Sequence, residues 1–92
     1  MARPLREEDY VGAIHHIIVR GVARSVIAVD AEDYDRTMFF LERTAERFQI
    51  GCLAWCLLPN HFHFVVTSRL ANRSDAMQWF GTNVAQSFNR RH

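Results

Sequence analysis

Apolar and polar residues repeat along the 92-residue chain with two different periods, which divide it into strands and helices. Residues 13–20 (AIHHIIVR) are rich in β-branched side chains and have a glycine on each side, so they are predicted to form a first strand. Residues 31–48 carry acidic residues in the first turn, where the helix dipole favours them, and apolar residues at helical spacing. This segment is predicted to be an amphipathic helix. Its apolar face consists of Tyr34, Met38, Leu41, Ala45 and Phe48.

The second half of the chain predicts two further strands and a second helix. Residues 50–58 are almost continuously apolar, which is typical of a strand covered on one face by helices and partly covered on the other. After a Pro-Asn turn, residues 61–67 (HFHFVVT) alternate, so that the histidines point to one side and the phenylalanines to the other. Asp75 with Gln78 resembles a capping box, and apolar residues follow at helical spacing to the end of the chain.

The order strand, helix, strand, strand, helix predicts an α+β fold of the ferredoxin-like split βαβ kind, with an antiparallel sheet and without that fold's last strand. Right-handed crossovers place both helices on one face of the sheet. Because Phe62 and Phe64 are assigned to the helix-covered face, His61 and His63 are expected on the open face. Residues 1–92 are expected to form a single domain.

The sequence also indicates in which cellular compartment the protein acts and whether its cysteines are reduced. The longest apolar stretches, residues 14–19 and 52–58, fall short of the roughly 20 residues that a membrane span needs. The N-terminus lacks the apolar stretch of a signal peptide, so a cytoplasmic protein is expected. Cys52 and Cys56 lie about 13 Å apart along one predicted strand, too far for a disulfide. Two buried, reduced thiols are expected, because this pair alone supplies too few ligands for zinc.

The His-Phe-His segment is the first candidate for chemistry. Two histidines at i and i+2 on a strand project from the same face, so both imidazoles can reach one divalent ion. For an arbitrary pair of this spacing, two solvent-facing residues are the more common explanation. On the first strand, His15 and His16 present one imidazole to each face. One is expected to be solvated, and the other to pack in the core or to assist the open-face site.

Several ordered motifs carry a more specific signal. Residues 58–66 (LPNHFHFVV) resemble the signature of the REP-associated tyrosine transposases, which belong to the single-tyrosine HUH transposases. Residues 3–6 (RPLR), 12–21 (GAIHHIIVRG), 33–34 (DY) and 88–92 (FNRRH) resemble the opening, first strand, first helix and Phe-Asn-Arg-Arg-His segment of that family. The resemblance therefore runs from residue 3 to the last residue, and it favours His61 and His63 as metal ligands.

The resemblance implies a reaction on single-stranded DNA, often next to a hairpin, during DNA transposition. In the family a tyrosine hydroxyl attacks a phosphodiester and forms a 5′-phosphotyrosine with a free 3′-hydroxyl. His61 and His63 would hold the divalent metal, Mg²⁺ or Mn²⁺. The metal would polarise the scissile phosphate and stabilise the charge that develops on its oxygens.

The family's nucleophile has no match in these 92 residues. It lies on a helix beyond a fourth strand, in a Tyr-x-x-x-Asn pattern, and the sequence stops at His92 before either element. Tyr10 precedes the first strand, Tyr34 is assigned to the core face of the first helix, and Val84 stands where many relatives have another tyrosine. No catalytic residue is therefore assigned. The chain is expected to be truncated before its catalytic tyrosine and inactive alone.

Charge distribution supplies candidate DNA contacts. The net charge is only +1, but nine of the ten acidic residues precede residue 50. The later, basic part of the chain contains four arginines that could follow a DNA backbone, although a solvated helix face explains them about as well. These four are Arg69, Arg73, Arg90 and Arg91.

Two other classes of function and one assembly state are considered. A non-enzymatic nucleic-acid-binding module of the same fold would stack bases on exposed aromatic residues of the sheet. The face of the sheet on which Phe62 and Phe64 lie therefore distinguishes such a module from a transposase domain. A small metal hydrolase would need further ligands, and residues 51–73 offer no Asp, Glu or His besides the pair.

A homodimer is expected, by pairing of the free edge of residues 13–20 or by exchange of the C-terminal helix.

Overall fold

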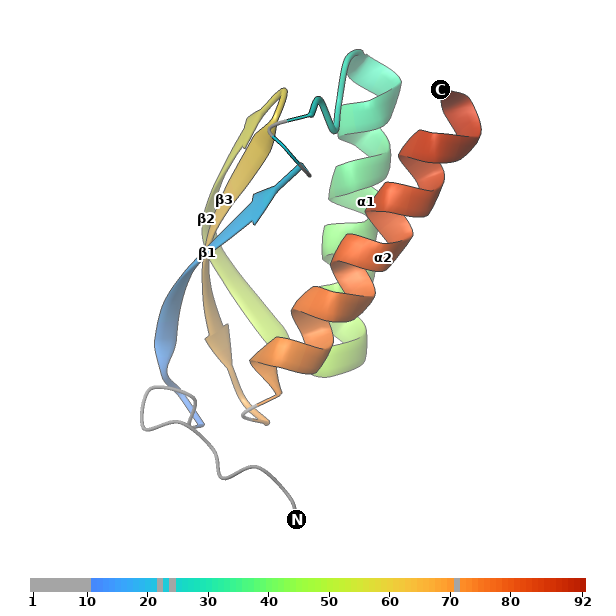
Figure 1. Cartoon of the computed structure of the whole chain (residues 1–92). Helices are drawn as coiled ribbons and strands as arrows, with labels where there is room; N and C mark the ends of the chain where they lie inside the picture. Colours follow the sequence, from blue (N-terminus) through green and yellow to red (C-terminus); the bar gives the residue numbers. More distant parts are fainter. Residues whose placement is uncertain (1–10, 22, 24, 71) are drawn as a thin grey trace.

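The computed structural model describes residues 11–21, 23, 25–70 and 72–92. Three strands form one sheet and both helices lie against the same face of it, so the fold has two layers (Figure 1). The elements are β1 (Ile14–Arg20), α1 (Ala31–Phe48), β2 (Ile50–Leu58), β3 (His61–Ser68) and α2 (Arg73–Arg91). This order confirms the predicted ferredoxin-like split fold. In the described part of the chain, no helix is long and apolar enough to cross a membrane.

The sheet has the order β1-β3-β2, with β3 in the centre and antiparallel to both neighbours. His61, the first residue of β3, lies opposite Arg20 of β1 and Leu58 of β2. Two residues further on, His63 lies opposite Ile18 and Cys56. Among the described residues β1 has no partner on its outer side, as expected from the predicted order of strands.

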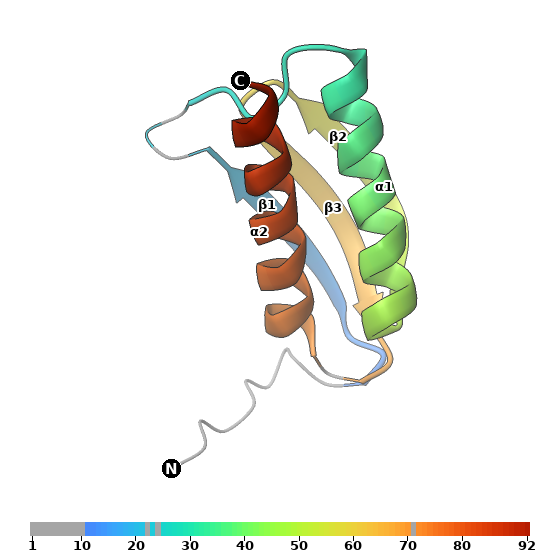
Figure 2. The ribbon, with the colours of Figure 1, turned by 90° about the vertical axis from the view of Figure 1, so that its right-hand side faces the viewer.

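The core lies between β3 and the helices. Phe62, Phe64 and Val66 are fully buried, whereas His61 and His63 on the alternate positions are half-buried on the other face. Helix α2 covers the β1 side of the sheet, and α1 covers the side of β2 (Figure 2). The predicted assignment of the two faces is confirmed. Because both phenylalanines are buried beneath the helices, they cannot act as a base-stacking platform.

Strand β2 is more exposed than the sequence predicted. Leu53, Trp55 and Cys56 are exposed, and Cys52 is only half-buried against the core. The pairing of β2 with β3 shifts register between Cys52 and Ala54, so the bulge at this point reverses the alternation of the strand. The prediction of a covered strand with two buried thiols was wrong for this reason, and because β2 lies at the edge of the sheet.

The second helix begins earlier than predicted. Asn72 occupies the N-cap position and Asp75 lies inside the first turn, so the predicted capping box at Asp75 was wrong. The side chain of Asn72 makes no capping hydrogen bond, because it is used elsewhere. Its amide donates to the carbonyl oxygen of Phe48, and its Oδ1 accepts from the hydroxyl of Ser68. Asn72 thereby ties the ends of α1 and β3 to the start of α2.

Candidate metal centre

His61 and His63 lie together on the open face of the sheet, at the start of β3. Their ring centroids are 4.8 Å apart and their planes are inclined by 76°. Both side chains are half-buried and neither points toward the helices. The expected placement of the two imidazoles on one open face is therefore confirmed, and this placement allows both to face one ion.

Asn60 sets the tautomer of His61. Nδ1 of His61 is 2.7 Å from Oδ1 of Asn60, and because an amide oxygen only accepts, the histidine nitrogen donates. A neutral His61 then has its lone pair on Nε2. This is the arrangement in which a histidine is ready to bind a metal through Nε2 while its other nitrogen is held by a neighbour.

A third imidazole belongs to the same cluster. Nε2 of His16, on β1, lies 3.1 Å from Nδ1 of His63, whereas His15 is buried on the helix-covered face. Of the alternatives left open for these two residues, His15 packs in the core and His16 joins the open face. Parity alone could not decide this, because each side of the strand offers one histidine together with β-branched apolar residues.

Arg20 is a site residue that the sequence analysis missed. It lies opposite His61 and is exposed. Together they border an open hollow of about 570 Å³. The hollow is lined by Arg20, Gly21, Ala23, Asn60, His61 and His63. The signal that could have found Arg20 is its parity with His16, four residues earlier, once His16 is assigned to the open face.

The surroundings of His63 disfavour its protonated form. Partial burial lowers the pKa of His63 below its ordinary value, and electrostatic repulsion from His61, His16 and Arg20 lowers it further. A neutral imidazole has a free lone pair, whereas a protonated one cannot bind a metal. His63 is therefore available as a ligand over a wider pH range than an isolated histidine.

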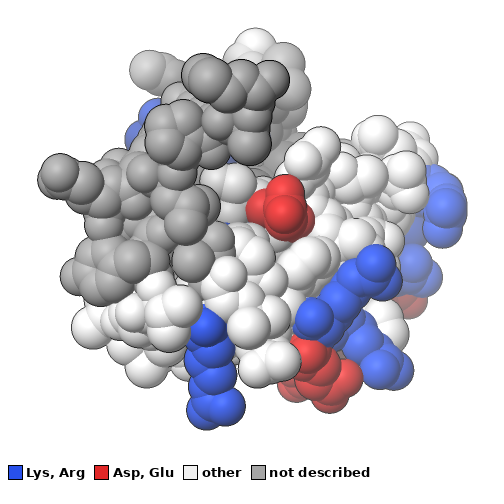
Figure 3. Space-filling model, turned by 90° about the horizontal axis from the view of Figure 1, so that it is seen from below, with Lys and Arg blue, Asp and Glu red and all other residues white. Residues whose placement is uncertain are grey.

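The structure does not gather the four predicted DNA-contacting arginines into one patch. Arg69 directly follows β3, eight residues from His61, which is about 26 Å along an extended strand. Arg73 begins α2 at the same end of the molecule, and Arg90 is exposed at the far end of that helix. In the view from below, several described arginine side chains lie together beside acidic residues, and another lies apart from them across uncharged surface (Figure 3).

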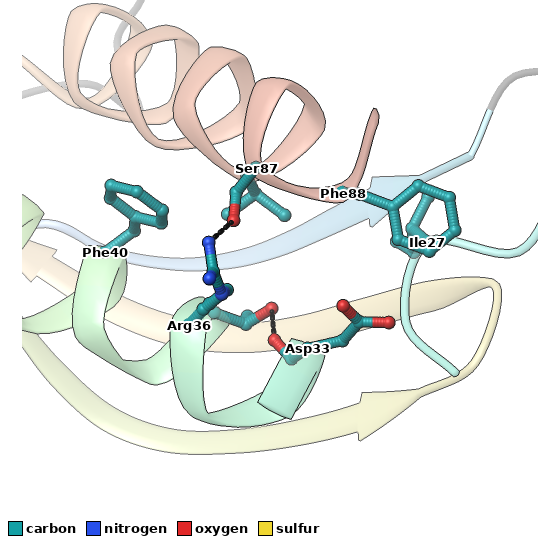
Figure 4. Close-up of a pocket in the computed structure, with 8 residues that line it drawn as sticks. Ile27, Asp33, Arg36, Phe40, Ser87 and Phe88 are labelled. Atoms are coloured by element: carbon teal, nitrogen blue, oxygen red, sulfur yellow. Dashed lines mark hydrogen bonds between the residues drawn. The ribbon is translucent and has the colours of Figure 1, made fainter. Parts of the chain in front are cut away.

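Arg91 is held by carboxylates where the end of α2 meets the start of α1. Its guanidinium binds both oxygens of Asp30, at 2.8 and 3.0 Å, and also contacts Glu32 and Asp33. The hydrogen bonds from Arg91, together with one from the backbone amide of Asp33, lower the pKa of Asp30 to about 2. A cavity of only about 10 Å³ lies nearby between the two helices, where Arg36 donates to the hydroxyl of Ser87 (Figure 4).

This seam also contains a second group of potential metal ligands, which the sequence analysis did not predict. Asp30, Asp33 and His92 each offer a ligand atom within 4.8 Å of the others, and they are the only such group of three among the described residues. Nε2 of His92 is 2.9 Å from Asp33. The guanidinium of Arg91 already occupies both carboxylates, so a cation would have to displace it. The group is explained as an ion-pair network between two helices.

Comparison with known proteins identifies the family. A search of curated proteins and one of solved structures gave no match. Residues 10–92 match the family model described as "Transposase IS200 like", which covers both histidines of the candidate site and all five elements of the fold. On this match over nearly its whole length, the chain belongs to the IS200-like transposase family.

Proposed function

We propose that this transposase chain binds single-stranded or hairpin DNA and takes part in metal-dependent strand transfer during DNA transposition. The observation that carries the proposal is the pair His61 and His63, side by side on the open face, with Nδ1 of His61 engaged by Asn60. A DNA substrate is consistent with action in the cytoplasm. The homology of the chain to transposases supports DNA as the partner.

The donor set fits a divalent ion. Two imidazoles supply nitrogen ligands, and none of the described residues that line the hollow beside them carries a carboxylate. Imidazole is a better ligand for Mn²⁺ than for Mg²⁺, which prefers oxygen, so Mn²⁺ is the favoured ion of the two. When bound, such an ion would polarise a phosphate oxygen and stabilise the charge that develops on it during transfer.

Arg20 is the proposed phosphate contact nearest to the histidines. Its guanidinium has five donors and a permanent charge, so it can bind two oxygens of one phosphate. Arg69, Arg73 and Arg90 remain candidates for contacts further along a DNA backbone. Arg91 could join them only by giving up its ion pairs with Asp30, Glu32 and Asp33.

Tyr34 is unsuited to act as the nucleophile. It lies on α1 and packs against the core on the helix-covered side of the sheet, whereas His61 and His63 lie on the opposite face. Tyr10 lies outside the described residues. Neither tyrosine matches the Tyr-x-x-x-Asn pattern of the family that the sequence resembles. We therefore propose that residues 1–92 hold the metal and provide part of the DNA-binding surface, and that the attacking hydroxyl comes from elsewhere.

A homodimer is also proposed, through the outer edge of β1. Backbone groups on an unpaired edge favour the addition of another strand. In the described part of the chain this edge has no strand beside it, and Ile14 on it is exposed. A second copy of β1 could supply the missing partner by twofold antiparallel pairing.

The metal proposal is tested by titrating Mn²⁺ into the protein in a calorimeter. Wild type should bind, and His61→Ala and His63→Ala should each remove most of the affinity. Asp30→Asn and His92→Ala serve as matched controls at the helix seam, and both should bind as wild type does. If instead the seam variants lose binding and the histidine variants keep it, the metal site lies at the seam and the proposal is wrong.

A further inference from the structure

We infer that His16 is a positioning residue that holds His63 in the tautomer and orientation required to bind the metal through Nε2. The inference rests on the proposed role of His61 and His63 as ligands. It assigns a task to an exposed histidine on a different strand, which the His-x-His segment itself does not contain.

The geometry is that of a hydrogen bond between ring edges. Nε2 of His16 is 3.1 Å from Nδ1 of His63, the ring planes are inclined by only 21°, and the centroids are 5.2 Å apart. The distance between the two nitrogens, added to the distance from each nitrogen to the centroid of its own ring, nearly equals the distance between the two centroids. The two nitrogens therefore lie close to the line between the rings, where a proton of one meets the lone pair of the other.

The direction of this bond follows from what His63 must do. If Nδ1 of His63 carries the proton and donates it, the lone pair of His63 is on Nε2, where a metal can bind. His16 then accepts through Nε2 and carries its own proton on Nδ1. His16 does for His63 what Asn60 does for His61, so each member of the pair has its Nδ1 held and its Nε2 free.

A role of His16 as a third ligand fits the structure less well. Two imidazoles that share one ion direct their lone pairs at the ion, away from the line that joins their nitrogens. Nε2 of His16 and Nδ1 of His63 instead lie close to the line between the two rings, so they face each other. The three imidazoles also do not bring one nitrogen each within 4.8 Å of the others, since only Asp30, Asp33 and His92 do so in the described residues. A purely structural role is also unsupported, because the side chain of His16 is exposed.

The test combines two measurements on metal-free and metal-bound protein. Long-range proton–nitrogen NMR of the metal-free protein, at a pH where the imidazoles are neutral, reports which nitrogen of His63 carries the proton. Calorimetry gives the affinity for Mn²⁺. We expect His63 to be protonated on Nδ1 in wild type and in His16→Gln, whose Oε1 can accept the same bond, and to lose this preference in His16→Ala. His16→Ala should bind Mn²⁺ about tenfold more weakly, and His16→Gln should restore most of the loss.

Two controls separate positioning from other effects. Ile14→Ala removes another exposed side chain from the same face of β1 and should change neither readout. In a His63→Ala background, His16→Ala should cause no further loss of affinity, because its partner is gone. Protonation of His63 on Nε2 in wild type, equal losses in both backgrounds, or equal behaviour of the Ala and Gln variants would each overturn the inference. Absence of Mn²⁺ binding by wild type would reject the proposed function instead, and the NMR result would still decide the role of His16.

Discussion

Arg20 lies directly opposite His61 across the β1–β3 ladder, which places a guanidinium beside the two imidazoles that are proposed to hold the metal. Most other arginines of the described chain lie on the helices or at the far end of the sheet. Arg20 differs from them because it lies next to the histidines, and not because it belongs to a cluster of basic residues. A phosphate that reaches the histidines would also reach Arg20. The pair would thus connect the proposed DNA binding to the proposed metal centre.

The first prediction is that Arg20→Gln weakens binding of hairpin DNA and lowers the salt dependence of that binding. One lost phosphate contact should reduce the slope of log K against log salt by about one, and Arg20→Lys should keep most of the slope. Fluorescence anisotropy at several salt concentrations measures it. Arg43→Gln is the control, because Arg43 is exposed on α1 and pairs with Glu46. An equal change in the control would indicate a nonspecific effect of charge.

The second prediction concerns metal choice. Because the proposed ligands are imidazoles, Mn²⁺ should bind more tightly than Mg²⁺ by at least about tenfold. The electron paramagnetic resonance signal of free Mn²⁺ reports the bound fraction during titration with Mg²⁺. Displacement of Mn²⁺ by an equal concentration of Mg²⁺ would argue for oxygen ligands, such as the carboxylates of the helix seam.

The fold was predictable where one side of an element is clearly apolar. In residues 61–67 every second side chain is a large apolar one, and the structure buries Phe62, Phe64 and Val66 while leaving His61 and His63 on the open face. Period and parity are local properties of the sequence, so they give the faces of β3 directly. The two histidines that are proposed as metal ligands could be placed on the open face for the same reason.

The remaining features depend on contacts between distant segments. His16 and Arg20 belong to the site because β1 pairs with β3 in one particular register, and no local pattern predicts that register. The bulge in β2 exposes Cys56, although the apolar run around it suggests burial. Arg91 was predicted as a DNA contact from charge alone, and its carboxylate partners lie about 60 positions earlier in the chain.

The third prediction is that Arg91→Gln reduces stability at neutral pH but not in strong acid. Asp30 has a pKa of about 2 in the folded chain, against an ordinary value of 3.8, chiefly because of its hydrogen bonds with Arg91. A lowered carboxyl pKa stabilises the fold above pH 3.8, and this contribution is lost as the pH falls toward about 2. Urea unfolding of wild type and variant across this range should therefore show a difference that shrinks with acid.

Asp33 should contribute in the same direction. Burial opposes its ionisation, but hydrogen bonds from the Val29 amide, His92 and Arg91 outweigh burial and lower its pKa. Arg43→Gln again provides the control, since its exposed pair with Glu46 should leave the acid profile unchanged. A difference between wild type and Arg91→Gln that stays constant with pH would show that Arg91 acts by packing and not by charge.

The fourth prediction tests the proposed dimer. Sedimentation of the 92-residue polypeptide should show a mass that rises with concentration toward that of two copies. Ile14→Lys places a charge at the exposed start of β1 and should weaken the association, because lysine on an edge strand opposes further pairing. Leu53→Lys, on the opposite edge of the sheet, is the matched control and should leave the association unchanged. A monomeric mass at all concentrations would reject the dimer.

The last prediction is that the polypeptide of residues 1–92 binds hairpin DNA but forms no covalent bond with it, even with excess Mn²⁺. Strand transfer needs an oxygen nucleophile near the metal, and Tyr34 lies across the sheet from His61 and His63. Binding should persist, because contacts to phosphate do not require the nucleophile. Labelled hairpins are incubated with the protein and analysed on native and denaturing gels, with Tyr10→Phe and Tyr34→Phe alongside wild type. A covalent adduct that disappears in either variant would make that tyrosine the nucleophile, whereas the absence of a shift at low salt would show that these residues alone do not bind DNA.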